Sequence, residues 1–232
     1  MVEIVKEATW LEWAEDSAQV FEKDGCAPFT ANVLCQALLF AGQYIQLNSA
    51  MIHSAKRVSL FAGFMEDSFD LLALPHAAYK FLQAAYSLDI TETIQNGCAI
   101  TYCLAAVVSV LDALGLLYLG DIRSLVQVMT CSSLLVSDTI TLMIQIKSWV
   151  TLGKTQTKKG ELKRALCALA YTITSVAYYM IQFVAATLFS VSGGLAATCL
   201  PIVLLQLARM VFRVAARYFE IANIRDAVSF SA

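Results

Sequence analysis

The chain has 232 residues, of which 59% are hydrophobic and 15% charged, and its formal net charge is −2. Ordinary soluble domains are about 45–50% apolar and about 25% charged. The composition therefore argues against an ordinary water-soluble domain and favours a membrane protein, while the small net charge identifies no partner.

The N-terminal region, residues 1–96, is mixed in character and predicts several amphipathic helices. Apolar side chains recur near helical spacing from Trp10 to Phe21 and again over residues 33–45. Pro75 is expected to end or kink a further helix, because proline removes a backbone donor. Charged residues near the start interrupt the apolar core that a cleavable signal peptide needs, so internal segments are expected to direct insertion.

One helix of this region combines cations with aromatic and aliphatic side chains. Lys56 and Arg57 precede Leu60, Phe61 and Phe64. Apolar burial and attraction to anionic lipid add together when such a helix lies in the headgroup layer. We therefore predict a membrane-interface site here, with simple packing on neighbouring helices as the alternative.

The second half of the chain is dominated by long apolar segments. About 20 apolar helical residues cross a hydrocarbon layer of about 30 Å. The predicted fold is therefore all-α, with transmembrane hairpins at residues 97–147 and 165–216. The four expected crossings are residues 97–120, 124–146, 165–192 and 195–216.

A basic loop, residues 148–164, separates the two hairpins. It includes Lys154, Lys158 and Lys159, and short loops rich in Lys and Arg stay on the cytoplasmic side. Four crossings then place the N-terminal region and the C-terminal tail, residues 217–232, on that side. The loop is expected to contact anionic lipid headgroups rather than nucleic acid, because it has no interleaved aromatic residues.

Three ionisable residues, Asp112, Asp138 and Arg209, fall within the apolar segments. Such residues are costly in a bilayer and often functional. Counted along the helices, Asp138 and Arg209 share a depth, which predicts an interhelical contact between them. The alternative is that Arg209 extends to the headgroups while Asp138 meets water or a hydroxyl such as that of Thr139. Asp112 is expected to face a polar seam or to mark a solute path.

Catalytic and metal-binding signatures are missing from the sequence. His53 and His76 are the only histidines and lie far apart, and no hydrolase, metalloprotease or nucleotide-binding motif is present. The seven cysteines are scattered among apolar residues, which is typical of reduced, space-filling thiols. We expect no enzyme activity, cofactor or metal.

Several stretches together resemble the peroxisomal peroxin-eleven family. The resemblance implies a membrane protein that elongates membranes by inserting an N-terminal amphipathic helix, with a peroxisomal location. The stretches are residues 33–41, 59–64 and 105–122, the Ser137-Asp138 pair, and the hairpin around Gly193-Gly194.

A second resemblance concerns the paired apolar helices with a very short turn at residues 120–123, a pattern repeated over residues 165–216. This arrangement is similar to the bilobed domain of chlamydial inclusion-membrane proteins. It implies a secreted scaffold in a vacuole membrane that binds host partners.

The function predicted from these observations is non-enzymatic shaping, elongation or scaffolding of an intracellular membrane by the N-terminal helices. Anionic lipids and further copies of the chain or other membrane proteins are the expected partners. The alternatives are the inclusion-membrane scaffold, a small oligomeric channel or carrier using Asp112 and Asp138, and a soluble, very apolar helical bundle.

Alkaline carbonate extraction checks the membrane prediction. Because the apolar segments are expected to cross the bilayer, the protein should stay in the membrane pellet after extraction and immunoblotting. Release into the supernatant would exclude integral insertion and leave a soluble or peripheral bundle.

Overall fold

The computed structural model describes residues 26–152, 159–189 and 200–231. These residues form α-helices, one short 3₁₀ helix and connecting turns, without a strand, which confirms the all-α prediction. The elements are α2 (Cys26–Ala41), α3 (Ser49–Tyr86), α4 (Ile90–Ala113), η1 (Gly120–Ile122), α5 (Arg123–Leu152), α6 (Lys159–Phe189) and α7 (Leu200–Ser231).

Side-chain caps define the starts of two helices. The Asn48 side chain accepts a hydrogen bond from the Ala50 backbone N–H at 3.0 Å at the start of α3, and Asp89 accepts one from Glu92 N–H at 3.0 Å at the start of α4. Such caps satisfy N–H groups that have no partner within the helix. Of the two outcomes expected at Pro75, an end of the helix is excluded, because α3 continues through this residue. A kink stays a prediction.

The turn between α4 and α5 contains two glycines with positive φ, Gly115 at 71° and Gly120 at 45°. Glycine adopts this region without the steric cost of a Cβ atom. Asp112 stabilises the same turn, since its Oδ1 accepts a hydrogen bond from the Leu119 N–H at 3.2 Å. The turn therefore begins before residue 120.

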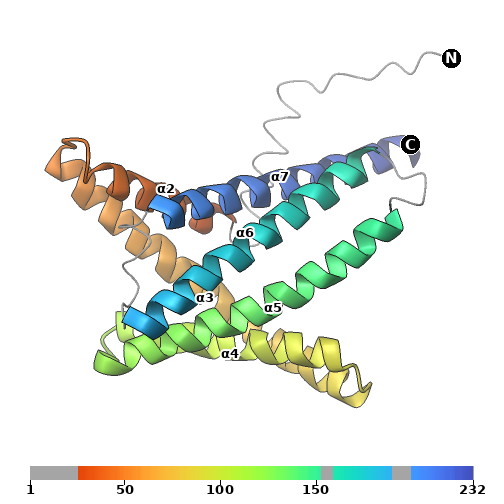
Figure 1. Cartoon of the computed structure of the whole chain (residues 1–232), viewed down its shortest axis with the longest axis horizontal. Coiled ribbons are helices and arrows are strands. Elements are labelled where there is room, and N and C mark those ends of the chain that lie inside the picture. Colours follow the sequence, from red (N-terminus) through yellow and green to blue (C-terminus); the bar gives the residue numbers. More distant parts are fainter. Residues whose placement is uncertain (1–25, 153–158, 190–199, 232) are drawn as a thin grey trace, which may run out of the picture.

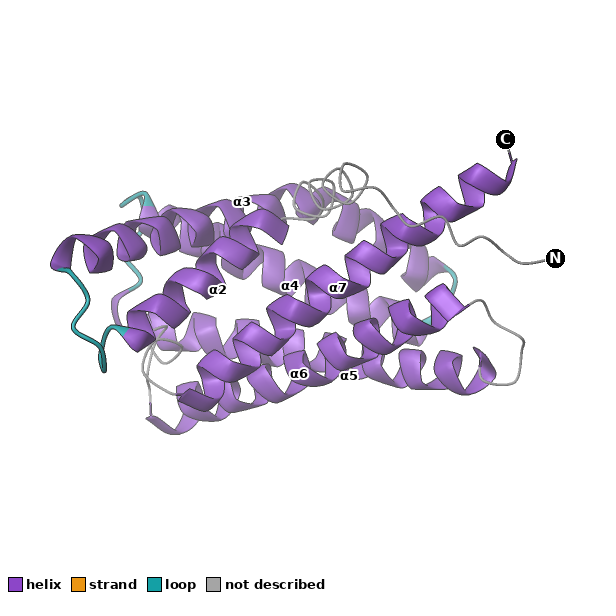
Figure 2. Cartoon of the chain, turned by 90° about the horizontal axis from the view of Figure 1, so that it is seen from above, coloured by secondary structure: helices purple, strands orange, loops and turns teal. Residues whose placement is uncertain are grey.

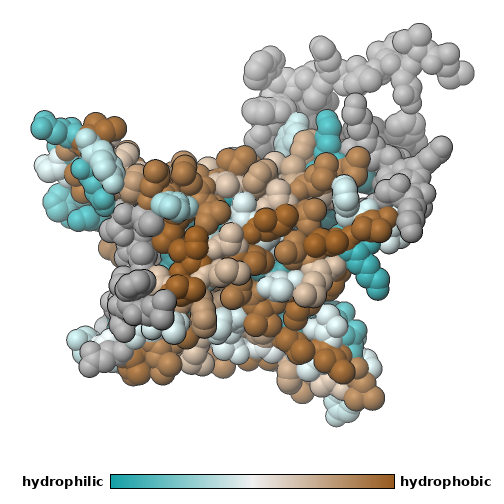
Figure 3. Space-filling model, in the orientation of Figure 1, coloured by the Kyte–Doolittle hydropathy of each residue, from teal (hydrophilic) through white to brown (hydrophobic). Residues whose placement is uncertain are grey.

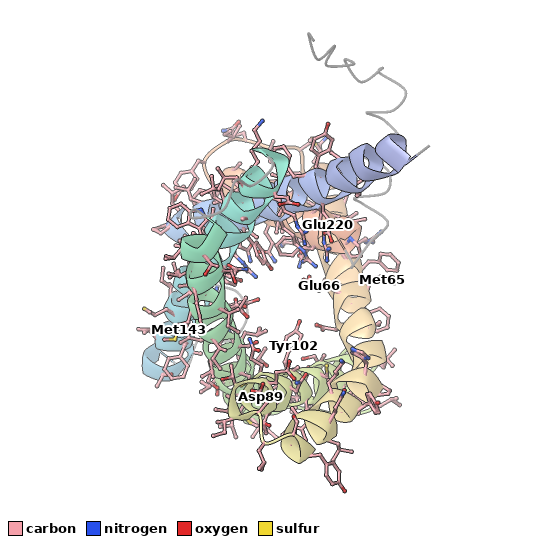
Figure 4. The ribbon with its side chains drawn as sticks, turned by 90° about the vertical axis from the view of Figure 1, so that its right-hand side faces the viewer. Met65, Glu66, Asp89, Tyr102, Met143 and Glu220 are labelled. Atoms are coloured by element: carbon pink, nitrogen blue, oxygen red, sulfur yellow. The ribbon has the colours of Figure 1, made fainter. Side chains whose placement is uncertain are left out.

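The helices are arranged as a closed ring. In chain order each helix packs on the next, and α2 also packs on α7, which closes the circle. Figure 4 looks along this ring, and Figures 1 and 2 show the long helices from two other directions. Within the described residues, α6 therefore separates α5 from α7.

The outside of the ring is apolar. Three helical segments are long and apolar enough to cross a membrane, Ile90–Asp112, Ser124–Thr151 and Glu161–Thr187, and only 11–17% of their most apolar windows is buried inside the protein. A soluble bundle would instead bury its apolar faces. Figure 3 shows hydrophobic side chains across the middle of one face, with hydrophilic ones towards its ends.

The fourth expected crossing, residues 195–216, is not among these spans in the described part of the chain. Helix α7 carries Arg209, Arg213, Arg217 and Glu220, which lower its mean hydropathy. The turn expected at residues 192–194 lies outside the described residues, as does the helix expected between Trp10 and Phe21.

The helix boundaries differ from the sequence-based segments. Helix α4 begins at Ile90, before residue 97. Helices α5 and α6 extend into the predicted basic loop from both sides, and α7 continues to Ser231 through most of the predicted tail. Of the charged residues in the predicted loop, Glu161, Lys163 and Arg164 therefore lie near the start of α6.

Candidate functional site

A polar cavity of about 260 Å³ lies inside the ring, and we call it the first cavity. Its lining comes from every long helix and from α2, and it consists largely of amide, phenol and charged side chains. Examples from successive helices are Asn32, Glu66, Tyr102, Gln127, Gln182 and Gln206. Glu66 and Tyr102 both point towards the middle of the ring in Figure 4.

A second polar cavity, of about 340 Å³, is lined by α5, α6 and α7. Its wall carries charges of both signs, including Asp138, Arg213 and Glu220. Glu220 forms ion pairs with Arg217 at 2.6 Å and with Arg164 at 3.5 Å. We call this space the second cavity.

The two cavities follow one another along the same three helices. On α5 the first is lined by positions 127–134 and the second by 138–145. On α6 the corresponding positions are 178–182 and 164–172, in the opposite chain direction. A separation of about 11 residues corresponds to roughly 16 Å at 1.5 Å per residue. The polar interior therefore extends along the helix axes.

Arg209 lies where the two cavities approach each other. It borders the first cavity, and its guanidinium carbon is 5.8 Å from the ring of Tyr171, which borders the second. The residue is 4% exposed. Its Nε donates to Ser175 Oγ at 2.9 Å, and one terminal nitrogen donates to the Tyr179 hydroxyl, also at 2.9 Å.

Aromatic rings complete the surroundings of this guanidinium. Its carbon lies 4.6 Å from the ring centres of Tyr178 and Tyr179 and 5.6 Å from that of Phe29. Cations are attracted to aromatic faces at such distances, more strongly when desolvated. Because the rings come from α2 and α6, the charge on α7 holds three helices together.

Other polar contacts link neighbouring helices across the interior. Gln127 Nε2 donates to Gln182 Oε1 at 3.3 Å, and Gln206 Nε2 donates to the Tyr178 hydroxyl at 2.6 Å. The Gln206 side chain oxygen is buried and has no hydrogen-bond partner, although the residue lines the first cavity. Buried acceptors normally have partners, and this unsatisfied one belongs to a side chain that borders the first cavity.

The predicted contact between Asp138 and Arg209 is wrong as a direct ion pair. Arg209 acts on Asp138 only electrostatically, and no ion pair within 4.0 Å joins these two described residues. The reason is the packing order: α6 lies between α5 and α7 and offers Ser175 and Tyr179 at shorter range. Asp138 borders the second cavity instead.

Asp112 lies at the end of α4, where it bonds the following turn. It is not among the residues that line either cavity. A local stabilising role in the turn accounts for its position, and the sequence-based idea of a solute path through Asp112 has no geometric support.

The predicted interface residues lie on the first half of α3. Lys56, Arg57, Leu60 and Phe61 are exposed, with Leu60 at 75% and Phe61 at 66%, whereas Phe64 is half-buried. Of the basic loop residues, Lys159 begins α6, and Lys154 and Lys158 lie outside the described residues.

Two further features carry no evident chemistry. One hollow, of about 530 Å³, is an open apolar groove beside the connection between α3 and α4. Within the described residues, no three His, Cys, Asp or Glu side chains gather in a way that could hold a metal ion.

The comparisons with known proteins give no relative from which a function could be carried over. No protein family, curated protein or solved structure matches this chain significantly.

Sequence reasoning missed Ser175, Tyr178, Tyr179, Gln182 and Gln206, because it started from the charged residues within the apolar segments. A detectable signal was present. The α6 residues recur at spacings of three, four and seven inside an apolar segment, which places them on one helix face.

The hydrogen bonds of Arg209 lead to a stability prediction. Replacing Tyr179→Phe or Ser175→Ala should each lower the free energy of unfolding by about 1.5–3 kcal/mol, since each removes one acceptor from a buried charge. Thermal unfolding in detergent micelles measures the effect.

Tyr171→Phe is the matched control, because its ring faces the same guanidinium but its hydroxyl makes no hydrogen bond with it in the described structure. Equal losses in the control and in Tyr179→Phe would show that the hydrogen bond contributes nothing.

Proposed function

We propose that this protein is an integral membrane protein that passes a small polar solute through the inside of its helix ring. One observation carries the proposal: two polar cavities follow one another along α5, α6 and α7, inside a ring whose outer surface is apolar. Polar groups facing inward and apolar groups facing outward suit a pathway surrounded by lipid.

The direction of the polar residues on α7 supports a membrane position for that helix. Gln206 and Arg209 line the first cavity, and Arg213, Arg217 and Glu220 line the second. Charges that lower mean hydropathy are compatible with crossing a membrane when they face a polar interior. The fourth crossing is therefore retained as part of the proposal.

Helix α3 is not among the three candidate spans, and the proposal adds it as a further crossing. Its exposed cations Arg57 and Lys80 are 23 positions apart, about 34 Å along a helix, which is close to the thickness of a hydrocarbon core. The described acids between them, Glu66 and Asp67, line the first cavity. With α2, which is shorter, the described part of the ring has six helices, so a chain that crossed the membrane with each of them would enter and leave on one side. In the proposal this is the side of the basic loop.

A second candidate function is the shaping or scaffolding of an intracellular membrane, peroxisomal or vacuolar. The exposure of Leu60 and Phe61 beside Lys56 and Arg57 supports it, because these side chains form an apolar and cationic surface on α3. Anionic lipids and further copies of the chain would be its partners. This surface lies apart from the two cavities.

Proteoliposome permeation tests the pathway. At least one solute in a panel of glycerol, urea, glycine, acetate, chloride and potassium should cross faster than in protein-free vesicles. Thr130→Trp should slow that solute by about tenfold or more, because Thr130 lines the first cavity and the larger side chain would fill it. Stopped-flow light scattering and entrapped ion-sensitive dyes provide the measurements.

Met129→Trp is the matched control, because Met129 is the preceding residue, is 47% exposed and lines neither cavity. Leu60→Gln with Phe61→Gln should leave permeation unchanged and would abolish membrane deformation if α3 shapes membranes. The pathway would be contradicted if no solute crossed faster than in protein-free vesicles, or if both tryptophan variants reduced permeation equally.

A further inference from the structure

The meeting point of the two cavities has the properties of a binding site. Arg209 is buried, permanently charged and positioned between α6 and α7. Arginine has five N–H donors, and the two hydrogen bonds to Ser175 and Tyr179 use two, which leaves three. A desolvated charge of this kind is costly unless an opposite charge or further hydrogen bonds meet it.

A second observation points to a ligand beside Arg209. The Gln206 oxygen, one helical turn earlier, is buried without a partner, and its residue is 7% exposed and lines the first cavity. A 180° turn of this amide lets the Tyr178 hydroxyl donate to the oxygen. The amide nitrogen then takes the place of the buried oxygen and is a donor without a partner, on the face of α7 that also carries Arg209.

We infer that Arg209 and Gln206 bind the carboxylate group of a small solute in the first cavity. This inference rests on the proposed pathway and names the solute class. Arginine holds a carboxylate through two parallel N–H···O bonds, which a planar anion matches and a neutral hydroxyl does not. Gln206 adds a third hydrogen-bond donor beside the guanidinium.

The other charged residues of the first cavity narrow the class of solute further. Glu66 and Asp67 line it as well and interact with other protein groups. Their negative charge opposes a dianion such as phosphate and attracts an ammonium group. A volume of about 260 Å³ corresponds to about nine water molecules, below the range of drug-sized sites. The solute that fits best is a small carboxylate that also carries an ammonium group.

Ligand-induced thermal stabilisation of the full chain in detergent tests the site directly. A ligand that binds the folded state raises the unfolding temperature with its concentration. Glycine and acetate should stabilise the protein, glycine at lower concentration, whereas glycerol and ethylamine at equal ionic strength should not. Stabilisation by ethylamine as strong as by acetate, or none by either carboxylate, would overturn the inference.

Three variants of Arg209 and Gln206 test whether these residues bind the carboxylate. Arg209→Gln should weaken the apparent affinity for glycine and acetate at least tenfold. Arg209→Lys keeps the positive charge but loses the two parallel N–H donors of the guanidinium. Gln206→Met keeps the size of the side chain but loses its amide. Both variants should therefore weaken carboxylate binding, and they test the site even if Arg209→Gln does not fold. Met129→Trp should bind normally. Unchanged carboxylate binding in the lysine and methionine variants would place the ligand elsewhere.

Binding and permeation results separate the two proposals. Carboxylate binding that depends on Arg209 without permeation of any solute would leave the site in place and remove the pathway. Permeation of other solutes with no carboxylate binding would keep the pathway and overturn this inference.

Discussion

The burial of one guanidinium organises the interior of this protein. Arg209 on α7 is surrounded by hydroxyls and rings from α6 and by Phe29 of α2. A charge that is removed from water must be met by groups at close range, so its position fixes the angle and register of the helices that provide them. The closure of the ring between α2 and α7 passes through this contact.

The same burial connects structure to function. A membrane protein gains little by packing apolar faces together, since lipid is equally apolar. Its helices are held instead by polar contacts such as Gln127 with Gln182 and Gln206 with Tyr178, which also line the first cavity. The groups that hold the bundle together thus also line the proposed pathway.

Segment length and composition were sufficient to predict an all-α fold and most of the long helices. The prediction failed where tertiary packing determines which side chains meet. Depth counting predicted a contact between Asp138 and Arg209, but it could not show that α6 lies between α5 and α7. Pro75 is tolerated inside α3, and Asp112 serves the adjacent turn. The uncharged members of the site were overlooked because phenols and amides are common in apolar helices and acquire meaning only when several helices place them around one cavity.

The central claim is that water reaches the inside of the ring while lipid covers the outside. In a variant whose native cysteines are replaced, single cysteines at Thr130 and Met129 test it by labelling in vesicles with a small water-soluble thiol reagent. The cysteine at position 130, which lines the first cavity, should react, and the exposed position 129 should be protected by lipid. Rapid labelling at position 129 with protection at position 130 would contradict the account and indicate a bundle surrounded by water.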